Sequence, residues 1–192
     1  MGLVLIKRQE NHVLGIWEIK ENLQEATEIY KKSIPINFKS DKRQLEYILT
    51  RLLLQKIDEN LRISYNEFGA PTLNCKKNIS ISHSNDLITI IISEKEVAVD
   101  IEKISNKPLK IKHKFISNKD SVLDNKIEAT LAWSAKEAVY KLHQQGRIDF
   151  KKDIIIRKID TIKKQIHTTF KKKNLVLNFQ DINNHFLVYV CI

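Results

Sequence analysis

A series of three apolar segments separated by short polar breaks most constrains the fold of this chain. The segments occupy residues 78–83, 87–93 and 97–102, and the breaks are Asn85-Asp86 and Glu94-Lys95-Glu96. Runs of this length that are rich in Ile and Val and are bounded by polar turn residues are typical of β-strands. The sequence therefore predicts three consecutive strands in the middle of the chain.

Helical patterns lie on both sides of these strands. Polar periodicity predicts one helix near residues 21–32. A second helix is predicted to begin after Ser40, which can cap it, and a third occupies residues 126–144. Further strand-like runs occupy residues 13–19, 154–159, 165–170, 175–179 and 186–191. Helices mixed with mainly antiparallel strands predict an α+β fold.

The charge of the chain is unevenly distributed. The formal net charge is +10, and residues 1–96 carry 14 Lys and Arg against 13 Asp and Glu, whereas residues 97–192 carry 19 against 10. A one-sided basic surface suits an acidic partner or a polyphosphate ligand, although a solvated lysine-rich surface explains many of these lysines equally well. Nucleic acid fits the charge too, but aromatic residues make up only 7% and no recognisable nucleic-acid motif accompanies them.

The apolar run near the amino terminus is too short for the core of a signal peptide, and no later stretch approaches the length of a membrane span. The two cysteines, Cys75 and Cys191, make no disulfide framework, and we expect two buried thiols in a reducing compartment. These observations predict a cytoplasmic protein that does not enter a membrane.

Two carboxylates occupy alternate positions in the third predicted strand. Because side chains alternate between the faces of a strand, Asp100 and Glu102 share one face, with their Cα atoms roughly 7 Å apart. Both side chains can therefore reach a single cation. A D-x-E pattern after an apolar run is, by itself, more often a solvated strand end.

The long predicted helix carries Trp133, Glu137 and Lys141 at positions i, i+4 and i+8, which share one face. A Glu-Lys pair at this spacing is among the commonest pairs on helix surfaces, so the pair alone indicates little. The tryptophan is less ordinary, since a tryptophan beside an exposed ion pair usually packs on another group.

A histidine ends the first predicted strand, in the sequence Ser80-Ile81-Ser82-His83-Ser84. Serine hydroxyls and amides at a strand end can hold a phosphate together with such a histidine. A lone histidine near a turn is more often a simple surface residue.

The order and spacing of these features resemble the phosphopantetheinyl transferase superfamily, and the longer monomeric, surfactin-synthetase-activating type more than the short trimeric carrier-protein synthases. In that family the motifs are G-K-P, I-S-H-S, V-G-(V/I)-D-I-E and W-(S/T)-x-K-E-(A/S)-x-x-K. The matching residues here are Gly69-Ala70-Pro71, Ile81-Ser82-His83-Ser84, residues 97–102 and residues 133–141, with a weaker match from Asp41-Lys42-Arg43 to Arg51.

The resemblance implies a magnesium ion bound by Asp100, Glu102 and Glu137, which agrees with the preference of Mg²⁺ for carboxylate, water and phosphate oxygens. It also implies two catalytic residues. Glu137 would take the proton of the attacking serine, directly or through water, and Lys141 would neutralise or protonate the departing 3′,5′-ADP.

Coenzyme A is the second ligand that the resemblance implies. The expected contacts are Ser82 and His83 at its phosphates, Lys42 or Arg43 at its 3′-phosphate, and the backbone of Gly69 and Pro71 along its adenine. Two departures from the family bear on this binding. Ala70 replaces the usual lysine between that glycine and proline, and the amino-terminal basic cluster is shortened, with Lys31 and Lys32 as stand-ins.

The implied fold is a pseudo-dimer of two similar halves, residues 1–96 and 97–192, with the coenzyme between them and the metal and catalytic residues on the second. The implied activity is the transfer of phosphopantetheine from coenzyme A to a serine of an acidic apo acyl or peptidyl carrier protein by a monomeric enzyme. The alternatives are a degenerate member that binds coenzyme A or a partner without catalysis, and a basic RNA-binding protein. The letters do not indicate which carrier protein would be served.

Overall fold

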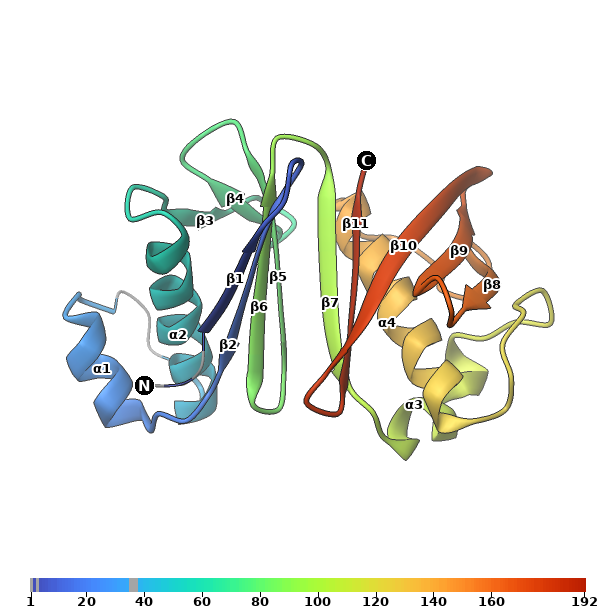
Figure 1. The fold of residues 1–192 in the computed structure, drawn as a ribbon, viewed down its shortest axis with the longest axis horizontal. Helices are drawn as coiled ribbons and strands as arrows, with labels where there is room; N and C mark the ends of the chain where they lie inside the picture. Colours follow the sequence, from blue (N-terminus) through green and yellow to red (C-terminus); the bar gives the residue numbers. More distant parts are fainter. Residues whose placement is uncertain (1, 3, 35–37) are drawn as a thin grey trace.

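The computed structural model describes residues 2, 4–34 and 38–192, which form two sheets, each flanked by helices (Figure 1). The helices are α1 (Leu23–Tyr30), α2 (Asp41–Ile57), α3 (Asn106–Lys110), the 3-10 helix η1 (Lys112–Lys114) and α4 (Lys126–His143). The strands are β1 (Val4–Arg8), β2 (Val13–Glu18), β3 (Ile63–Tyr65), β4 (Pro71–Leu73), β5 (Asn78–Ser84), β6 (Leu87–Ser93), β7 (Val97–Lys103), β8 (Ile154–Asp160), β9 (Gln165–Phe170), β10 (Lys173–Ile182) and β11 (His185–Cys191).

The first sheet has the strand order β1-β2-β6-β5 and the second has the order β7-β11-β10-β9-β8, while β3 and β4 form a separate hairpin. All of the described strand pairs are antiparallel. Helices α1 and α2 cover the first sheet, and α4 lies across the second (Figure 1). The predicted α+β class is confirmed. The similarity of the two halves and their boundary between residues 96 and 97 stay predictions.

The three strands predicted in the middle of the chain are present, but β7 leaves the sheet of its two predecessors. Strand β6 pairs with β5 on one side and β2 on the other, so both of its edges are occupied. Strand β7 instead pairs with β11, the last strand of the chain. Residues 94–96 therefore carry the chain from one sheet to the other, and β5 and β7 become neighbouring edge strands.

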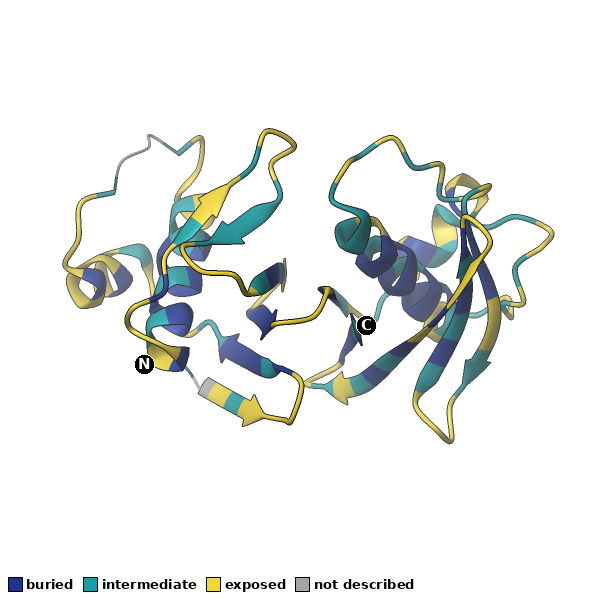
Figure 2. Cartoon of the chain, turned by 90° about the horizontal axis from the view of Figure 1, so that it is seen from above, coloured by how far each residue is buried: buried dark blue, intermediate teal, exposed yellow. Residues whose placement is uncertain are grey.

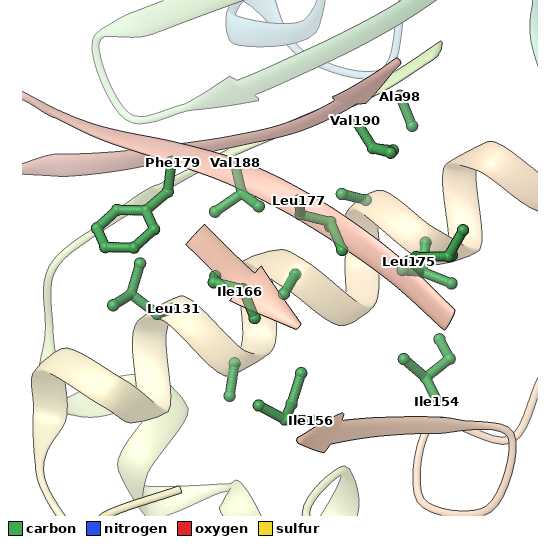
Figure 3. Close-up of a cluster of buried hydrophobic side chains, with 14 of the residues drawn as sticks. Ala98, Leu131, Ile154, Ile156, Ile166, Leu175, Leu177, Phe179, Val188 and Val190 are labelled. Atoms are coloured by element: carbon green, nitrogen blue, oxygen red, sulfur yellow. The ribbon is translucent and has the colours of Figure 1, made fainter. Parts of the chain in front are cut away.

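Each half has its own apolar core, and the buried positions gather where each sheet faces its helices (Figure 2). In the second half the apolar face of α4 packs on strands β8 to β11, with Leu131, Ile166, Leu177 and Val188 all fully buried (Figure 3). A third cluster joins the two sheets and consists of Leu14, Ile16, Leu87, Ile91, Val97, Val99, Ile101 and Leu187. The halves are thus held together by apolar packing as well as by the chain.

Two findings bear on the expected location of the protein. Within the described ranges, none of the helices combines the length and the apolar content that crossing a bilayer requires. Cys75 is exposed and Cys191 is half-buried, so the expectation of two buried thiols is wrong.

Candidate active site

Asp100 lies at the junction of the two sheets and is only 3% exposed. One of its carboxylate oxygens, Oδ1, accepts hydrogen bonds from Ser82 Oγ at 2.9 Å and Lys141 Nζ at 2.7 Å. The other oxygen, Oδ2, accepts a hydrogen bond from Ser134 Oγ at 2.8 Å. The aspartate therefore links β5, β7 and α4 at one point.

Glu102 lies two residues further along β7, beside the tryptophan of α4. Its Oε1 accepts a hydrogen bond from Trp133 Nε1 at 3.1 Å. The indole ring also packs against Phe115 and Phe150, with ring centroids 5.0 and 5.7 Å away, which supplies the packing partner that the sequence led us to expect. Burial raises the pKa of the Glu102 carboxyl, and the neighbouring charge of Asp100 raises it further.

Glu137 projects from α4 toward the same two acids. Burial, the charge of Asp100 and that of Glu102 raise its pKa to about 7, although Lys141 opposes the shift. A carboxyl group with this pKa exchanges its proton near neutral pH, as a general base must. The three acids and Lys141 named from the sequence therefore interact with one another.

The fit of a metal ion to these acids can be judged from their chemistry. Carboxylate oxygens are the donors that Mg²⁺ prefers, and their mutual repulsion favours a cation between them. In the described ranges, however, no group of three or more His, Cys, Asp or Glu side chains is close enough to hold a metal ion as it stands. The ammonium group of Lys141 forms an ion pair with Asp100 instead. The donor chemistry fits magnesium, provided that these side chains adjust, and the metal site stays a prediction.

Three of the predicted coenzyme contacts of the first half lie around a buried acid that the sequence did not single out. Glu46 on α2 is 7% exposed and lies 3.1 Å from Arg43, 3.9 Å from Lys42 and 3.7 Å from the Nδ1 of His83. Partial burial lowers the pKa of His83, whereas the charge of Glu46 raises it and the charges of Arg43 and Lys141 lower it. The charges that act on His83 thus come from the start of α2 and from Lys141 of α4.

Two adjoining cavities lie beside these groups, and of the second half's acids and Lys141 only the lysine lines either cavity. One, of about 270 Å³, is lined by both halves, including Gly69, Ala70 and Pro71 of the β3–β4 hairpin, Tyr140 and Lys141 of α4, and Gln144 just after that helix. The other, of about 370 Å³, is lined by residues of α2, including Arg43, Glu46 and Arg51. Both cavities are lined by Tyr65, Ile81 and His83, so they adjoin around these residues. Among the predicted coenzyme contacts, Ser82 and Lys42 line neither.

No protein-family profile matches the chain. A protein of Aneurinibacillus migulanus, 4′-phosphopantetheinyl transferase gsp, is 28% identical to it over 123 residues, which cover 58% of this chain and 52% of that protein. The chain therefore spans about half the length of this relative. The resemblance to the phosphopantetheinyl transferase superfamily is confirmed.

Not every charged residue of the superfamily motif at residues 133–141 faces the acids. Lys136 is fully buried and donates hydrogen bonds to the carbonyl oxygens of Phe115 at 2.7 Å and Phe150 at 2.9 Å. It also forms an ion pair of 2.9 Å with Asp120, which is equally buried. This lysine holds the segment before α4 in place.

Several residues of the site escaped the sequence analysis. Glu46 is one of two acids in α2, and only its burial distinguishes it. Tyr65 and Phe68 of the β3–β4 hairpin, and Tyr140 of α4, line the smaller cavity. Their proximity follows from tertiary packing between segments 70 residues apart, which no local pattern reports.

Proposed function

We propose that this protein is a magnesium-dependent 4′-phosphopantetheinyl transferase that acts on coenzyme A and an apo carrier protein. The observation that carries the proposal is the cluster of Asp100, Glu102, Glu137 and Lys141, whose lysine lines a cavity between the halves that adjoins a second cavity on α2. The similarity to a phosphopantetheinyl transferase supports this choice among the reactions that such a cluster could perform.

The reaction is a displacement at the pyrophosphate of coenzyme A. Glu137 takes the proton of the carrier serine hydroxyl, whose oxygen then bonds to the phosphorus atom that bears the pantetheine arm. The bond from that phosphorus to the 3′,5′-ADP breaks, and Lys141 neutralises or protonates the leaving oxygen. Asp100, Glu102 and Glu137 would hold the magnesium ion, which supplies charge neutralisation for the pyrophosphate.

The two cavities would hold the 3′,5′-ADP part of coenzyme A, whose ribose carries both the adenine and the 3′-phosphate. The larger cavity is lined by Arg43, which would pair with the 3′-phosphate, and Lys42 is the alternative partner. Gly69 and Pro71 would contribute backbone contacts to adenine. Gly69 has a φ of 78°, which residues that carry a side chain rarely adopt. His83, which lines both cavities, would meet the phosphates between them.

The basic excess of the second half supports an acidic carrier protein as the partner. Lys110, Lys112, Lys114 and Lys119 lie in and after α3, in or next to the segment that Lys136 anchors at Phe115 and Asp120. Lys112 already pairs with Asp124 at 2.6 Å, so Lys114 and Lys119 carry more of the uncompensated charge. Charge complementarity of this kind accelerates association more than it deepens affinity.

One assay tests the proposed activity. The protein is incubated with coenzyme A, Mg²⁺ and an apo carrier protein, and the mass of the carrier is measured. A phosphopantetheine increment that depends on Mg²⁺ supports the proposal. Coenzyme A binding without any increment would instead indicate a degenerate member, and RNA binding without coenzyme binding would indicate the remaining alternative.

Charge reversal tests the docking surface separately. Reversal of Lys112 and Lys114 together should lower the second-order rate for the carrier several-fold at low salt and leave the rate at saturating carrier unchanged. Reversal of Lys172, at the β9–β10 turn, is the matched control. If the Lys172 change is the damaging one, the carrier docks on that turn instead.

A further inference from the structure

The joint between the two sheets is made by serine side chains rather than by a backbone ladder. Strands β5 and β7 are edge strands of different sheets and run next to each other (Figure 1). Ser80, Ser82 and Ser84 occupy alternate positions of β5 and therefore share one face. That face is turned toward β7.

Each serine accepts a hydrogen bond from one amide of β7. The distances are 3.1 Å from Val99 N to Ser80 Oγ, 3.3 Å from Ile101 N to Ser82 Oγ and 3.1 Å from Lys103 N to Ser84 Oγ. The serines thus satisfy the donors that an edge strand would otherwise leave unpaired. We refer to these three serines as the serine ladder.

Ser82 differs from the other two because it contacts both Asp100 and Lys141, whereas Ser84 donates one long hydrogen bond, of 3.5 Å, to Glu102. Its hydroxyl donates to Asp100 Oδ1 at 2.9 Å and accepts from Lys141 Nζ at 2.8 Å, in addition to the bond from Ile101 N. A hydroxyl has one hydrogen and two lone pairs, so all of its hydrogen-bonding capacity is in use. It has no donor left for a phosphate.

The ammonium group of Lys141 also uses all of its hydrogen bonds within the protein. Its ammonium group has three hydrogens, and they are directed at Ser82 Oγ, Asp100 Oδ1 and the carbonyl oxygen of Val99, the last at 3.3 Å. Two of these three acceptors belong to β7 and the third to β5. The position of the lysine is therefore set by the joint between the halves, and to act on the leaving oxygen it would exchange the longest of these bonds, the one to Val99.

We propose that Ser82 is a positioning residue that orients Asp100 and Lys141 through the serine ladder, and that it does not contact coenzyme A. Only the kinetic consequences of this inference rest on the proposed function. The inference revises the role that the superfamily resemblance assigned to this serine, because the hydroxyl has no donor left for a phosphate.

The test compares Ser82→Ala with Ser80→Ala. Each variant removes the hydroxyl that accepts one β7 amide, but only Ser82→Ala removes a contact with Asp100 and Lys141. Amide hydrogen exchange should increase at Ile101 in the first variant and at Val99 in the second. Titration with Mn²⁺ alone, which shares the preference for oxygen ligands, should show weaker binding by Ser82→Ala only. Loss of a group that orients a metal ligand typically weakens metal binding or activity about 10–100-fold.

Kinetics and coenzyme binding complete the experiment. Ser82→Ala should lower kcat by a similar factor, whereas its affinity for coenzyme A in EDTA should match that of the unmodified protein. Ser82→Thr, which keeps the hydroxyl, should recover most of the loss. The inference is overturned if Ser82→Ala weakens metal-free coenzyme binding as much as it lowers kcat, or if Ser80→Ala loses as much metal affinity and turnover.

The readouts on the protein alone separate this inference from the proposed function. If the unmodified protein transfers nothing to a carrier, the proposed function fails. Weaker Mn²⁺ binding that is specific to Ser82→Ala would still support the positioning role. Equal Mn²⁺ binding by the unmodified protein, Ser82→Ala and Ser80→Ala would reject it.

Discussion

Helix α4 carries two lysines, five residues apart, that each bind an aspartate in very different surroundings. Lys136 and Asp120 are both completely buried, 2.9 Å apart, and the aspartate also accepts hydrogen bonds from Ser117 and from the amide of Ile156. One positive and one negative charge balance there, and every polar group has a partner. Such a pair is expected to hold the structure and to do no chemistry.

The second pair, Lys141 and Asp100, is 2.7 Å apart, but the lysine side chain is 26% exposed. Here Glu102 and Glu137 add negative charge that one lysine does not balance, and burial with mutual repulsion raises the pKa values of both glutamates. The contrast suggests that an unbalanced pair beside a cavity, rather than the ion pair itself, marks the functional site. Each of the following predictions tests this contrast.

The largest expected effect is on transfer. Asp100→Ala or Glu137→Ala should abolish phosphopantetheine transfer while the protein stays folded, because each removes a proposed oxygen ligand and a repelling charge, and neither residue belongs to an apolar cluster. Carrier mass measures the transfer, and circular dichroism checks the fold. Asp181→Ala, which breaks an exposed ion pair with Lys164, is the control and should remain active. Near-normal turnover of either site variant in saturating Mg²⁺ would show that the site is wrongly assigned.

The next effect is on stability. Lys136→Met should lower the free energy of unfolding by about 3–5 kcal/mol, because it leaves the charge of Asp120 buried and unpaired. Lys141→Met should cost less, about 1–2 kcal/mol, since Asp100 keeps hydrogen bonds from the hydroxyls of Ser82 and Ser134. Urea unfolding measures both. Equal losses would remove the distinction between the two pairs.

A third effect concerns pH. The folded-state pKa of Glu137, about 7, lies above its ordinary value of 4.5, so the folded protein binds more protons than the unfolded chain between these values. Stability of the metal-free protein should therefore fall as pH rises from 4.5 to 7, by on the order of 2–3 kcal/mol from this group.

Glu137→Gln should remove this part of the pH dependence, since the amide does not titrate. Thermal unfolding across the pH range in EDTA provides the measurement, and added Mg²⁺ should restore stability at pH 7 and above in the unmodified protein. An unchanged pH profile in the Gln variant would mean that the pKa of Glu137 is not raised.

Local sequence patterns were sufficient to predict most of the acidic cluster. The alternation of β7 placed Asp100 and Glu102 on one face, and the helical spacing placed Glu137 and Lys141 together. The strands β5 to β7 and the helix α4 were predicted for the same reason, since their periodicity is a local property.

Features that depend on long-range packing could not be predicted. The pairing of β7 with β11 joins segments some 90 residues apart, and the short strands β1, β3 and β4 lack a strong pattern of their own. Lys136 is adjacent to Glu137 in sequence, yet it points to a partner in an irregular segment. The hydroxyl of Ser82 suggested a phosphate contact, whereas the structure uses it between the sheets.

The smallest effect concerns a lysine that this chain lacks. Ala70 lines the same cavity as Lys141, and its amide and carbonyl groups are both held by Asn66, so a longer side chain would leave the turn intact. Ala70→Lys should tighten coenzyme A binding by about 1 kcal/mol or less, the scale of a partly exposed charge contact. The gain should be largest at low salt, where screening is weak. Calorimetry measures it, with Ala70→Met as a control of similar length without charge. Unchanged or weaker binding would indicate that Lys76 or Lys77 already supplies the missing charge, and the unbalanced acids beside Lys141 would then be the part of the site that limits coenzyme binding.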